Sequence, residues 1–445
     1  MHLVIIGNGI AGVTAACTAR RLAPAARITL VSAESAHHYS RPALMYLYLG
    51  HLRYADVKPY ADWFWAENRL DLLQAEATGL DPAAHIVQLA TGKTLTYDRL
   101  LLATGSVSRF FDWPGQQLRG VQGLYGLPDL AQMERDTQGI RQAVVVGGGL
   151  IGVELAEMLH ARGIAVKLLV REPHYWASVL PPEEAALVAQ QIIHQGIDLQ
   201  FITELREILG DADGRVRAVV TTAGRKLPCQ WVGLATGVVP NCALAQAAGL
   251  DTDRGILVDE LLRTSAPDVY AAGDCAQHRR PAPGEAAVEQ LWYTGRQQGE
   301  TAAQAICGIP TPYQRGVWFN SAKFFALDYH TYGRVPARPE AGTASFCWQH
   351  PGGGHLLRIN FRPTENCAVT GLNALGLRQR HAVWERWLRE KTPVQTVLSE
   401  LGAANFDPEF FRRHEADIRR EFVRQFPELP LAAVPRRGLL ARFGR

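Results

Sequence analysis

The sequence predicts an α/β fold with two similar strand–turn–helix modules in succession and a smaller α+β domain at the C-terminus. A buried strand runs into a glycine-rich turn at residues 4–12, and the same pattern recurs at residues 143–152. From about residue 313 the composition becomes aromatic and basic. With 445 residues the chain is too long for one hydrophobic core, so we expect two or three domains.

The first module begins with an apolar strand that ends in Gly7, Gly9 and Gly12. An alanine-rich helical stretch follows, and a second β-rich run at residues 28–31 ends near Glu34. In a G-x-G-x-x-G turn the first glycine makes the tight turn and the second lets the backbone approach a pyrophosphate. The third glycine lets the helix pack closely on the strand. The amides at the helix N-terminus then favour phosphate.

The second module repeats this order about 140 residues later. An apolar strand runs into Gly147, Gly149 and Gly152, a helix is expected at residues 153–162, and a strand at residues 165–170. One such turn could arise by chance, whereas two in the same strand–turn–helix context indicate two dinucleotide sites.

Composition excludes several other classes of protein. The 46 basic and 43 acidic residues nearly balance, which gives no reason to expect a nucleic-acid partner. No apolar run is long enough to span a bilayer, and the chain enters its first strand without a charged leader, so we expect a cytoplasmic protein. The seven cysteines are scattered without C-x-x-C spacing, so neither a metal site nor a disulfide framework is expected.

Four further motifs follow in a fixed order along the chain. Residues 39–44 read Y-S-R-P-A-L, residues 100–105 read L-L-L-A-T-G, residues 234–241 read L-A-T-G-V-V-P-N, and residues 269–274 read V-Y-A-A-G-D. Together with the two glycine turns, they resemble the two-dinucleotide-binding-domain flavoprotein superfamily, the pyridine nucleotide-disulfide oxidoreductases. Residues 1–335 look most like ferredoxin reductases, NADH oxidases and the flavin part of nitrite reductase large subunits.

The resemblance implies an FAD-binding Rossmann-like domain with an inserted NAD(P)-binding Rossmann-like domain and a C-terminal α+β interface domain. The expected bounds are 1–112 with 245–312 for FAD, 113–244 for NAD(P)H, and 313–445 for the interface domain. In the last of these we expect short strands between residues 330 and 361 and amphipathic helices at residues 381–389 and 407–424. The basic tail at residues 434–445 is either solvated or docks on an acidic partner or a membrane surface.

The residues expected to bind FAD come from the first glycine turn and from the motifs of the resemblance. Glu34 is placed for the adenosine ribose, although Ser32 is an alternative. Trp292 lies near the start of a helix expected to face the flavin, although it could equally be a core residue. The full set is Gly7, Gly9, Gly12, Glu34, Arg41, Pro42, Ala77, Thr104, Gly105, Asp274 and Trp292.

The residues expected to bind NAD(P)H are Gly147, Gly149, Gly152, Glu154, Arg171, Glu172 and Gly237. Glu154 resembles the glutamate that borders the nicotinamide in this superfamily. Val170 occupies the strand-end position where NADH-specific relatives carry an acidic residue, and Arg171 follows. A cation there suits the 2′-phosphate of NADPH, whereas the adjacent Glu172 suits the ribose diol of NADH. The sequence favours NADPH slightly and leaves both donors open.

The chain departs from its relatives in the segment beside the flavin. Residues 37–50 contain no cysteine. Ala43 lies near the position of the single reactive cysteine of the NADH oxidase and coenzyme A disulfide reductase branch of this superfamily. Met45 and Tyr46 stand where ferredoxin reductases carry a serine and a lysine. A thiol relay at this position is therefore excluded. Cys275 is the cysteine placed nearest to FAD, and we expect it to be a packing residue.

The expected activity is that of an FAD-dependent NAD(P)H oxidoreductase. Hydride passes from NAD(P)H to the flavin, and electrons pass on to a ferredoxin-like redox protein or a quinone, with no side chain acting as a nucleophile. Dioxygen is the alternative acceptor, and a redox-signalling or assembly role is the alternative from another class. We expect a monomer or a homodimer.

Overall fold

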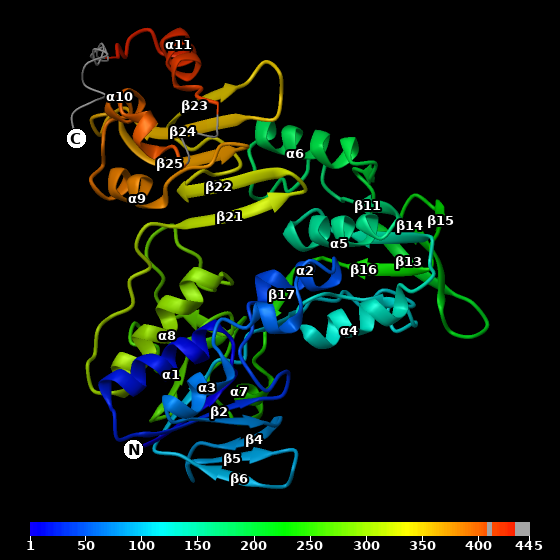
Figure 1. Cartoon of the computed structure of the whole chain (residues 1–445), viewed down its shortest axis with the longest axis vertical. Helices are drawn as coiled ribbons and strands as arrows, with labels where there is room; N and C mark the ends of the chain where they lie inside the picture. The colour runs from blue at the N-terminus through cyan, green and yellow to red at the C-terminus, as the bar shows by residue number, and fades with distance from the viewer. Residues whose placement is uncertain (407–411, 432–445) are drawn as a thin grey trace. The chain divides into compact units, whose positions relative to one another are not determined.

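The computed structural model describes residues 1–406 and 412–431, which form two compact units (Figure 1). The first unit comprises residues 1–169 and 204–315, and the second comprises residues 170–203 and the chain from residue 316 onward. The predicted tail at residues 434–445 lies outside the described residues, as does part of the helix predicted at 407–424. The domain boundaries drawn from the sequence stay a prediction.

The first unit is centred on a five-stranded parallel sheet in the order β19-β7-β1-β2-β3. Every residue of β1 after His2 is buried, which is why its sequence is a continuous apolar run. The strands of this sheet are β1 (His2–Ile6), β2 (Arg27–Ser32), β3 (Leu70–Gln74), β7 (Arg99–Leu102) and β19 (Val269–Ala271).

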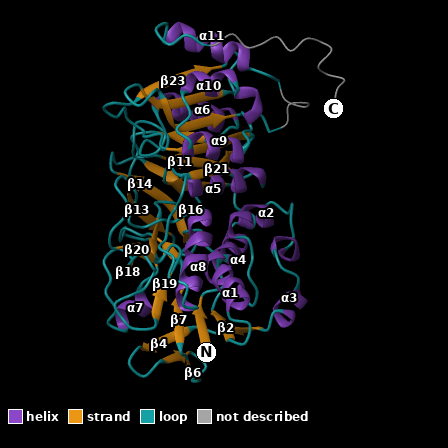
Figure 2. Cartoon of the chain, turned by 90° about the vertical axis from the view of Figure 1, so that its left-hand side faces the viewer, coloured by secondary structure: helices purple, strands orange, loops and turns teal. Residues whose placement is uncertain are grey.

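Two helices of this part, α1 (Ile10–Leu22) and α8 (Trp292–Ile306), lie side by side (Figure 2). Their close approach depends on glycine, because a Cβ at Gly299 would lie 2.2 Å from the Ala11 carbonyl oxygen. The remaining elements here are η1 (Arg41–Ala43), α2 (Leu44–Tyr48), η2 (Tyr54–Val57), α3 (Asp62–Glu67), β4 (Ala77–Asp81), β5 (Ile86–Leu89), β6 (Thr94–Thr96), α7 (Ala243–Ala247), β18 (Ile256–Val258) and β20 (Ala276–His278).

The second glycine turn belongs to another parallel sheet of the first unit, with neighbours in the order β11-β10-β16-β9. The chain leaves and re-enters the first part through β8 and β17, which pair antiparallel. These elements are β8 (Ser106–Ser108), β9 (Val121–Gln122), α4 (Leu127–Asp136), β10 (Gln142–Val146), α5 (Leu150–Ala161), β11 (Ala165–Leu169), β13 (Leu205–Gly210), β14 (Val216–Thr221), β15 (Lys226–Pro228), β16 (Trp231–Leu234) and β17 (Val238–Pro240).

The second unit contains a five-stranded antiparallel sheet in the order β21-β22-β25-β24-β23. Glu184 is fully buried, and its carboxylate pairs with Arg358 at 2.7 Å, which joins the segment 170–203 to this sheet. The elements are α6 (Pro182–His194), β12 (Asp198–Gln200), β21 (Phe319–Phe324), β22 (Leu327–Gly333), β23 (Ala344–Gln349), β24 (Leu356–Arg362), β25 (Ala368–Leu375), α9 (His381–Arg389), α10 (Val394–Ser399), η3 (Leu401–Ala404) and α11 (Glu415–Gln425).

The predicted fold class is confirmed, because both modules and the C-terminal α+β part are present. The helix predicted at residues 153–162 begins three residues earlier, at Leu150, directly after the second glycine of its turn. The helix at 381–389 has the predicted bounds, and Pro351 to Gly354 lie in the loop between β23 and β24. Within the described residues, no helix combines the length and the apolarity required to cross a membrane.

Candidate functional site

The first glycine turn has the geometry of a phosphate cradle. Gly7 has φ +112°, and a Cβ on it would lie 2.0 Å from the carbonyl oxygen of Ala103. A Cβ on Gly12 would lie 2.0 Å from the carbonyl oxygen of Gly7. At Gly9, directly before α1, no heavy atom of the described chain comes within 4 Å of an added Cβ. Gly7 and Gly12 are therefore required by packing, whereas Gly9 faces open space at a helix N-terminus, where a phosphate binds well.

The second turn repeats this division of roles. A Cβ on Gly147 or on Gly152 would lie 2.1 Å from a backbone carbonyl oxygen, and Gly147 has φ +128°. Gly149, at the start of α5, again has no described heavy atom within 4 Å of an added Cβ. Both turns can therefore hold a pyrophosphate.

Glu34 and Arg41, which the sequence assigned to FAD, form an ion pair with 2.7 Å between Nη2 and Oε2. Oε1 of Glu34 accepts hydrogen bonds from the Tyr39 hydroxyl and, at 2.9 Å, from the Leu127 amide. Burial alone would raise the pKa of Glu34, but the bonds and charge of Arg41 and the Tyr39 hydroxyl outweigh it and lower this pKa. Both oxygens thus have protein donors, so an adenosine ribose at Glu34 would have to replace or share one of them.

Asp274 lies at the centre of a second polar cluster. Its Oδ2 accepts hydrogen bonds from the Ser106 hydroxyl at 3.2 Å and from the Tyr125 hydroxyl at 3.4 Å. The Ser106 hydroxyl also accepts from Gln290 at 2.8 Å. Burial raises the pKa of Asp274. Tyr125 connects this cluster to Arg41, whose guanidinium lies 4.4 Å from the centre of the Tyr125 ring.

The structure brings most of the predicted FAD residues together. Thr104 and Gly105 follow directly after Ala103, whose carbonyl oxygen faces Gly7, and Thr104 donates to the carbonyl oxygen of Asn241 at 2.7 Å. Pro42 is the second residue of η1, directly after Arg41. Ala77 lies apart from these contacts, at the start of β4, where it packs on the core of the first unit.

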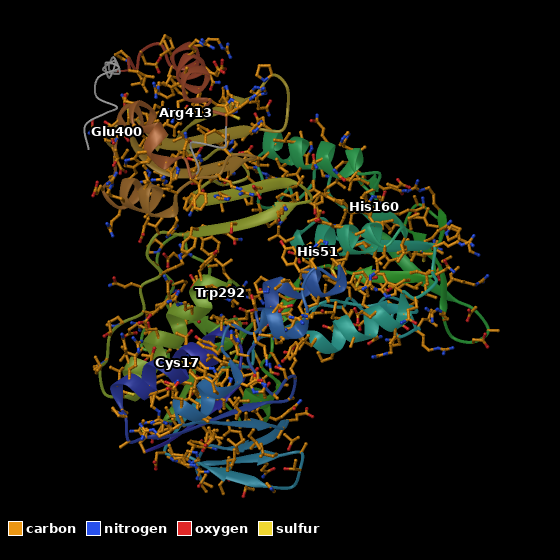
Figure 3. The ribbon with its side chains drawn as sticks, viewed as in Figure 1. Cys17, His51, His160, Trp292, Glu400 and Arg413 are labelled. Atoms are coloured by element: carbon orange, nitrogen blue, oxygen red, sulfur yellow. The ribbon has the colours of Figure 1, made fainter. Side chains whose placement is uncertain are left out.

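Trp292 is the first residue of α8 and is half-buried (Figure 3). Its ring lies 5.3 Å from that of Tyr293 in a T-shaped arrangement. Both interpretations of Trp292, a position over the flavin edge and a plain packing residue, stay predictions.

Glu154 lies on the second turn of α5, half-buried. Burial and the nearby charge of Glu157 raise the pKa of Glu154 to about 7. Glu154 thus keeps its proton at a higher pH than an exposed carboxyl group does.

Gly237, at the exit of the second module, has φ +101°, a conformation that favours glycine.

The helix α2, which follows Arg41, is fastened to the second module. The Tyr48 hydroxyl bonds to the Thr137 hydroxyl at 2.7 Å, and the Arg162 guanidinium lies 3.5 Å from the centre of the Tyr48 ring. Arg162 also donates from Nε to the Tyr48 carbonyl oxygen at 3.1 Å. Tyr46, which stands in place of the lysine of ferredoxin reductases, is on this same helix.

Arg171 and Glu172, the residues expected to choose between NADH and NADPH, belong to the second unit. They pair with each other at 2.9 Å between Nη2 and Oε1, and the Arg171 side chain is 70% exposed. An exposed pair of this kind contributes little to stability, so Arg171 can exchange its partner for a phosphate at low cost.

The described cysteines form no disulfide. Cys275 is fully buried, and its Sγ donates to the carbonyl oxygens of Leu102 at 3.4 Å and Ala272 at 3.5 Å. Burial raises the pKa of this thiol. Its surroundings are those of a packing residue, as the sequence led us to expect.

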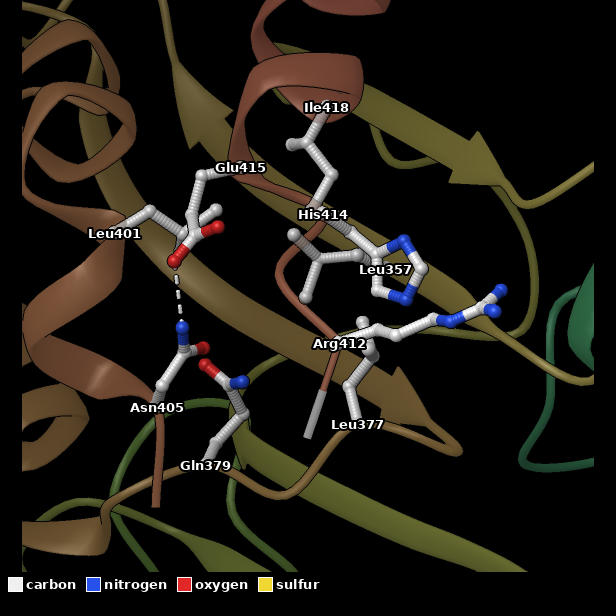
Figure 4. Close-up of a pocket in the computed structure, with 9 residues that line it drawn as sticks. All are labelled: Leu357, Leu377, Gln379, Leu401, Asn405, Arg412, His414, Glu415 and Ile418. Atoms are coloured by element: carbon white, nitrogen blue, oxygen red, sulfur yellow. Dashed lines mark hydrogen bonds between the residues drawn. The ribbon is translucent and has the colours of Figure 1, made fainter. Parts of the chain in front are cut away.

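A separate small pocket lies within the second unit (Figure 4). Asn405 donates to Glu415 at 2.6 Å on one side of it. None of the predicted cofactor residues is among the described residues that line it, which are Leu357, Leu377, Gln379, Leu401, Asn405, Arg412, His414, Glu415 and Ile418.

Comparison with known proteins identifies the family. Residues 1–299 match the family described as pyridine nucleotide-disulphide oxidoreductase. The chain belongs to this family. The resemblance inferred from the motifs is thereby confirmed, and the protein is an oxidoreductase that uses FAD and NAD(P)H.

Relatives within this oxidoreductase family include reductases of redox proteins. The chain is 31% identical over 368 residues to the 5,5'-dehydrodivanillate O-demethylase ferredoxin reductase subunit of a Sphingobium species, which covers 80% of this chain and 89% of the relative. It is also 31% identical to rubredoxin-NAD(+) reductase of Pseudomonas putida over 70% of this chain and 81% of that protein.

Solved structures of the same oxidoreductase fold cover more of the chain. A ferredoxin reductase from Rhodopseudomonas palustris aligns with a TM-score of 0.76 and 26% identity over 84% of this chain and 91% of its own. An NAD-dependent persulfide reductase from A. fulgidus aligns with a TM-score of 0.83 and 25% identity over 96% of this chain and 84% of its own. The second match therefore includes most of the C-terminal part.

The residues present fit an FAD. The open space beside Gly9, the amides of α1 and the carboxylate of Asp274 offer the donor and acceptor groups that a pyrophosphate and a polyol chain require. Sequence reasoning missed Ser106, Tyr125 and Gln290, which contact Asp274 or its partner. Ser106 directly follows the A-T-G motif and could have been found. Tyr125 lies in a stretch that carries no motif.

Proposed function

We propose that this oxidoreductase takes hydride from NADPH and passes the electrons, through FAD, to a small iron–sulfur or similar redox protein. The observation that carries the proposal is the combination of two dinucleotide cradles with a flavin-side segment that contains no thiol, residues 37–50. Relatives that are 31% identical to this chain are named as a ferredoxin reductase subunit and a rubredoxin-NAD(+) reductase. A chain without the thiol must hand its electrons directly from the flavin to the acceptor.

In this proposal the protein positions the reactants and sets their charge. The first cradle and α1 hold the FAD phosphates, and the Asp274 carboxylate accepts hydrogen bonds from hydroxyl groups of the cofactor chain. When bound, the flavin supplies the redox chemistry, because it accepts a hydride and can release electrons singly. The second cradle and Glu154 hold the donor, and a glutamate that keeps its proton near neutral pH can donate a hydrogen bond to a carboxamide oxygen.

Arg171 supports NADPH as the donor. Its exposed guanidinium pairs with the neighbouring Glu172. A 2′-phosphate forms stronger, charge-assisted bonds to a guanidinium than a ribose diol does. NADH remains the other donor, with Glu172 as its ribose ligand. The cytoplasmic location and the monomeric or homodimeric state expected from the sequence also stay predictions.

Anaerobic turnover with a panel of acceptors tests the proposal. With NADPH as donor we expect a [2Fe–2S] ferredoxin or a rubredoxin to be reduced faster than a soluble quinone, and dioxygen to be the slowest acceptor in an aerobic arm. Faster turnover with quinone or dioxygen would overturn the choice of acceptor but not of cofactors. If NADPH reduces the bound FAD but none of these acceptors reoxidises it, the result would favour a signalling or assembly role.

A further inference from the structure

Glu289, three residues before the start of α8, carries a buried charge that the proposed mechanism does not use. Its side chain is 2% exposed, and its carboxylate accepts a hydrogen bond from the Tyr313 hydroxyl at 2.7 Å and from Arg315 at 3.2 Å. The ring of His278 stacks on that of Tyr313, and its Nε2 lies 4.0 Å from Glu289. Burial lowers the pKa of His278, so Arg315 is the cation that balances Glu289 near neutral pH.

Gln298 on α8 links this carboxylate to the motif that contains Asp274. It is fully buried, its Nε2 donates to Glu289 at 3.2 Å, and its Oε1 accepts from the Gly273 amide at 2.8 Å. A backbone N–H can only donate and a carboxylate can only accept, so both neighbours require the same orientation of the amide group. Glu289 therefore fixes which atom of Gln298 faces Gly273.

Gly273 sets the direction of Asp274. It has φ +83°, and a Cβ on it would lie 2.9 Å from the Cβ of Ala11 on α1. The turn therefore lies against α1, and its amide is held by α8. The bond from Gly273 to Gln298 joins the aspartate to both helices whose N-termini are expected to face the cofactor.

We propose that Glu289 and Gln298 are positioning residues of the FAD site. The pair holds the Gly273 amide so that the Asp274 carboxylate and the first turn of α8 are already arranged for the cofactor before it binds. Tyr313 and Arg315, directly before the second unit, hold the pair in turn. Preorganisation of this kind raises affinity by lowering the ordering cost of binding. The proposal rests on the proposed role of Asp274 in FAD binding.

The first test removes both bonds of Gln298 and keeps its volume. In Gln298→Met the Gly273 amide loses its acceptor, and we expect FAD to dissociate about tenfold more readily, the effect of one buried hydrogen bond. Gln304→Met, at a half-buried position of the same helix, is the control and should retain the wild-type dissociation constant. The readouts are FAD dissociation by flavin fluorescence and thermal unfolding of the apoprotein.

The second test exchanges the two side chains. Gln298→Glu alone places two carboxylates about 3 Å apart, so it should weaken FAD binding about tenfold or more, and more at about pH 9 than at about pH 6. The groups that face this position are Arg315, Tyr313 and His278, with Glu285 beyond Arg315. In the double variant Gln298→Glu with Glu289→Gln, the new glutamine donates to the new glutamate, and FAD affinity should return to within about threefold of wild type without that pH dependence.

The outcomes separate the two proposals. If Gln298→Met lowers the unfolding temperature while FAD affinity is unchanged, the pair is merely structural and the positioning role is wrong. If the double exchange fails to restore affinity beyond that of Gln298→Glu, the hydrogen-bonded link is wrong. If Asp274→Ala itself binds FAD as wild type does, the assignment of Asp274 fails first.

Discussion

The two glycine turns have nearly the same backbone geometry, but their surroundings differ. The residues assigned to the first turn's cofactor form a connected group of polar contacts. Arg41 pairs with Glu34 and donates to the Tyr125 carbonyl oxygen, and the Tyr125 hydroxyl donates to Asp274. The second turn leads into the helix that carries Glu154, which is half-buried with a raised pKa. Arg171, which the sequence assigns to the same cofactor, belongs to the second unit and is an exposed cation that pairs with Glu172. Preorganised groups favour a cofactor that stays bound, whereas exposed ones favour a substrate that must leave after each turnover. The contrast indicates that FAD is the resident group and the nicotinamide dinucleotide the exchanging one.

The largest effects should come from filling each turn in the same way. Gly9→Trp places an indole in the space where the FAD pyrophosphate would lie, and we expect this variant to be purified without flavin. Gly149→Trp should leave FAD in place and abolish its reduction by NAD(P)H. The absorbance of bound flavin after gel filtration and its anaerobic bleaching measure both results. Reversed results would mean that the two cofactors are assigned to the wrong turns.

Asp274→Ala should have the next largest effect, because it removes the carboxylate at the centre of the first polar cluster. A charge-assisted bond contributes about 2 kcal/mol, so FAD affinity should fall on the order of thirtyfold. Asp71→Ala, at an exposed position on β3, is the control. The FAD dissociation constant measures the effect, and a constant equal to that of the control would remove Asp274 from the site.

These clusters also show where sequence analysis succeeds and where it stops. The two turns, the A-T-G strand end and Asp274 were predictable because each belongs to a short sequence motif. In the turns, the motif arises because glycine is required where one backbone segment packs closely on another. The pairing of Glu34 with Arg41 and the approach of Tyr125 were not predictable. The approach of Tyr125 joins residues separated by 84 positions from Arg41 and by 149 from Asp274, which no local pattern encodes. Glu34 and Arg41 are only seven residues apart, but the segment between them has no periodic pattern that predicts their pairing. The early start of α5 was missed because a glycine turn continues directly into its helix.

Arg171→Glu tests the predicted role of the exposed Arg171 in binding the nicotinamide dinucleotide. It places a carboxylate where the 2′-phosphate is expected, so NADPH should lose on the order of 2 kcal/mol of binding and NADH much less. The Kd of each dinucleotide for the oxidised enzyme is the measurement. An equal loss for both would mean that Arg171 points elsewhere, and Glu172→Ala would be the next variant.

Glu154→Gln should have the smallest effect, and one that depends on pH. The folded-state pKa of about 7 lies above the ordinary value of 4.5, so the folded protein loses stability as pH rises between these values. Glutamine removes that loss, and the apoprotein should gain about 1 to 2 kcal/mol at pH 8 and almost nothing at pH 4. Urea unfolding at both values measures it, with the exposed Glu76→Gln as control. A gain that is equal at both values would contradict the raised pKa.

The central claim is that bound FAD receives hydride from the nicotinamide and passes electrons on without a thiol. Stopped-flow absorbance under anaerobic conditions tests it most directly, with NADPH added first and oxidised ferredoxin second. We predict a yellow protein whose flavin band is bleached by NADPH and recovers with ferredoxin, at the same rates in wild type and in Cys275→Ser. A colourless protein that takes up no FAD, a flavin that NAD(P)H does not bleach, or a Cys275→Ser variant that keeps FAD but no longer reoxidises would contradict it.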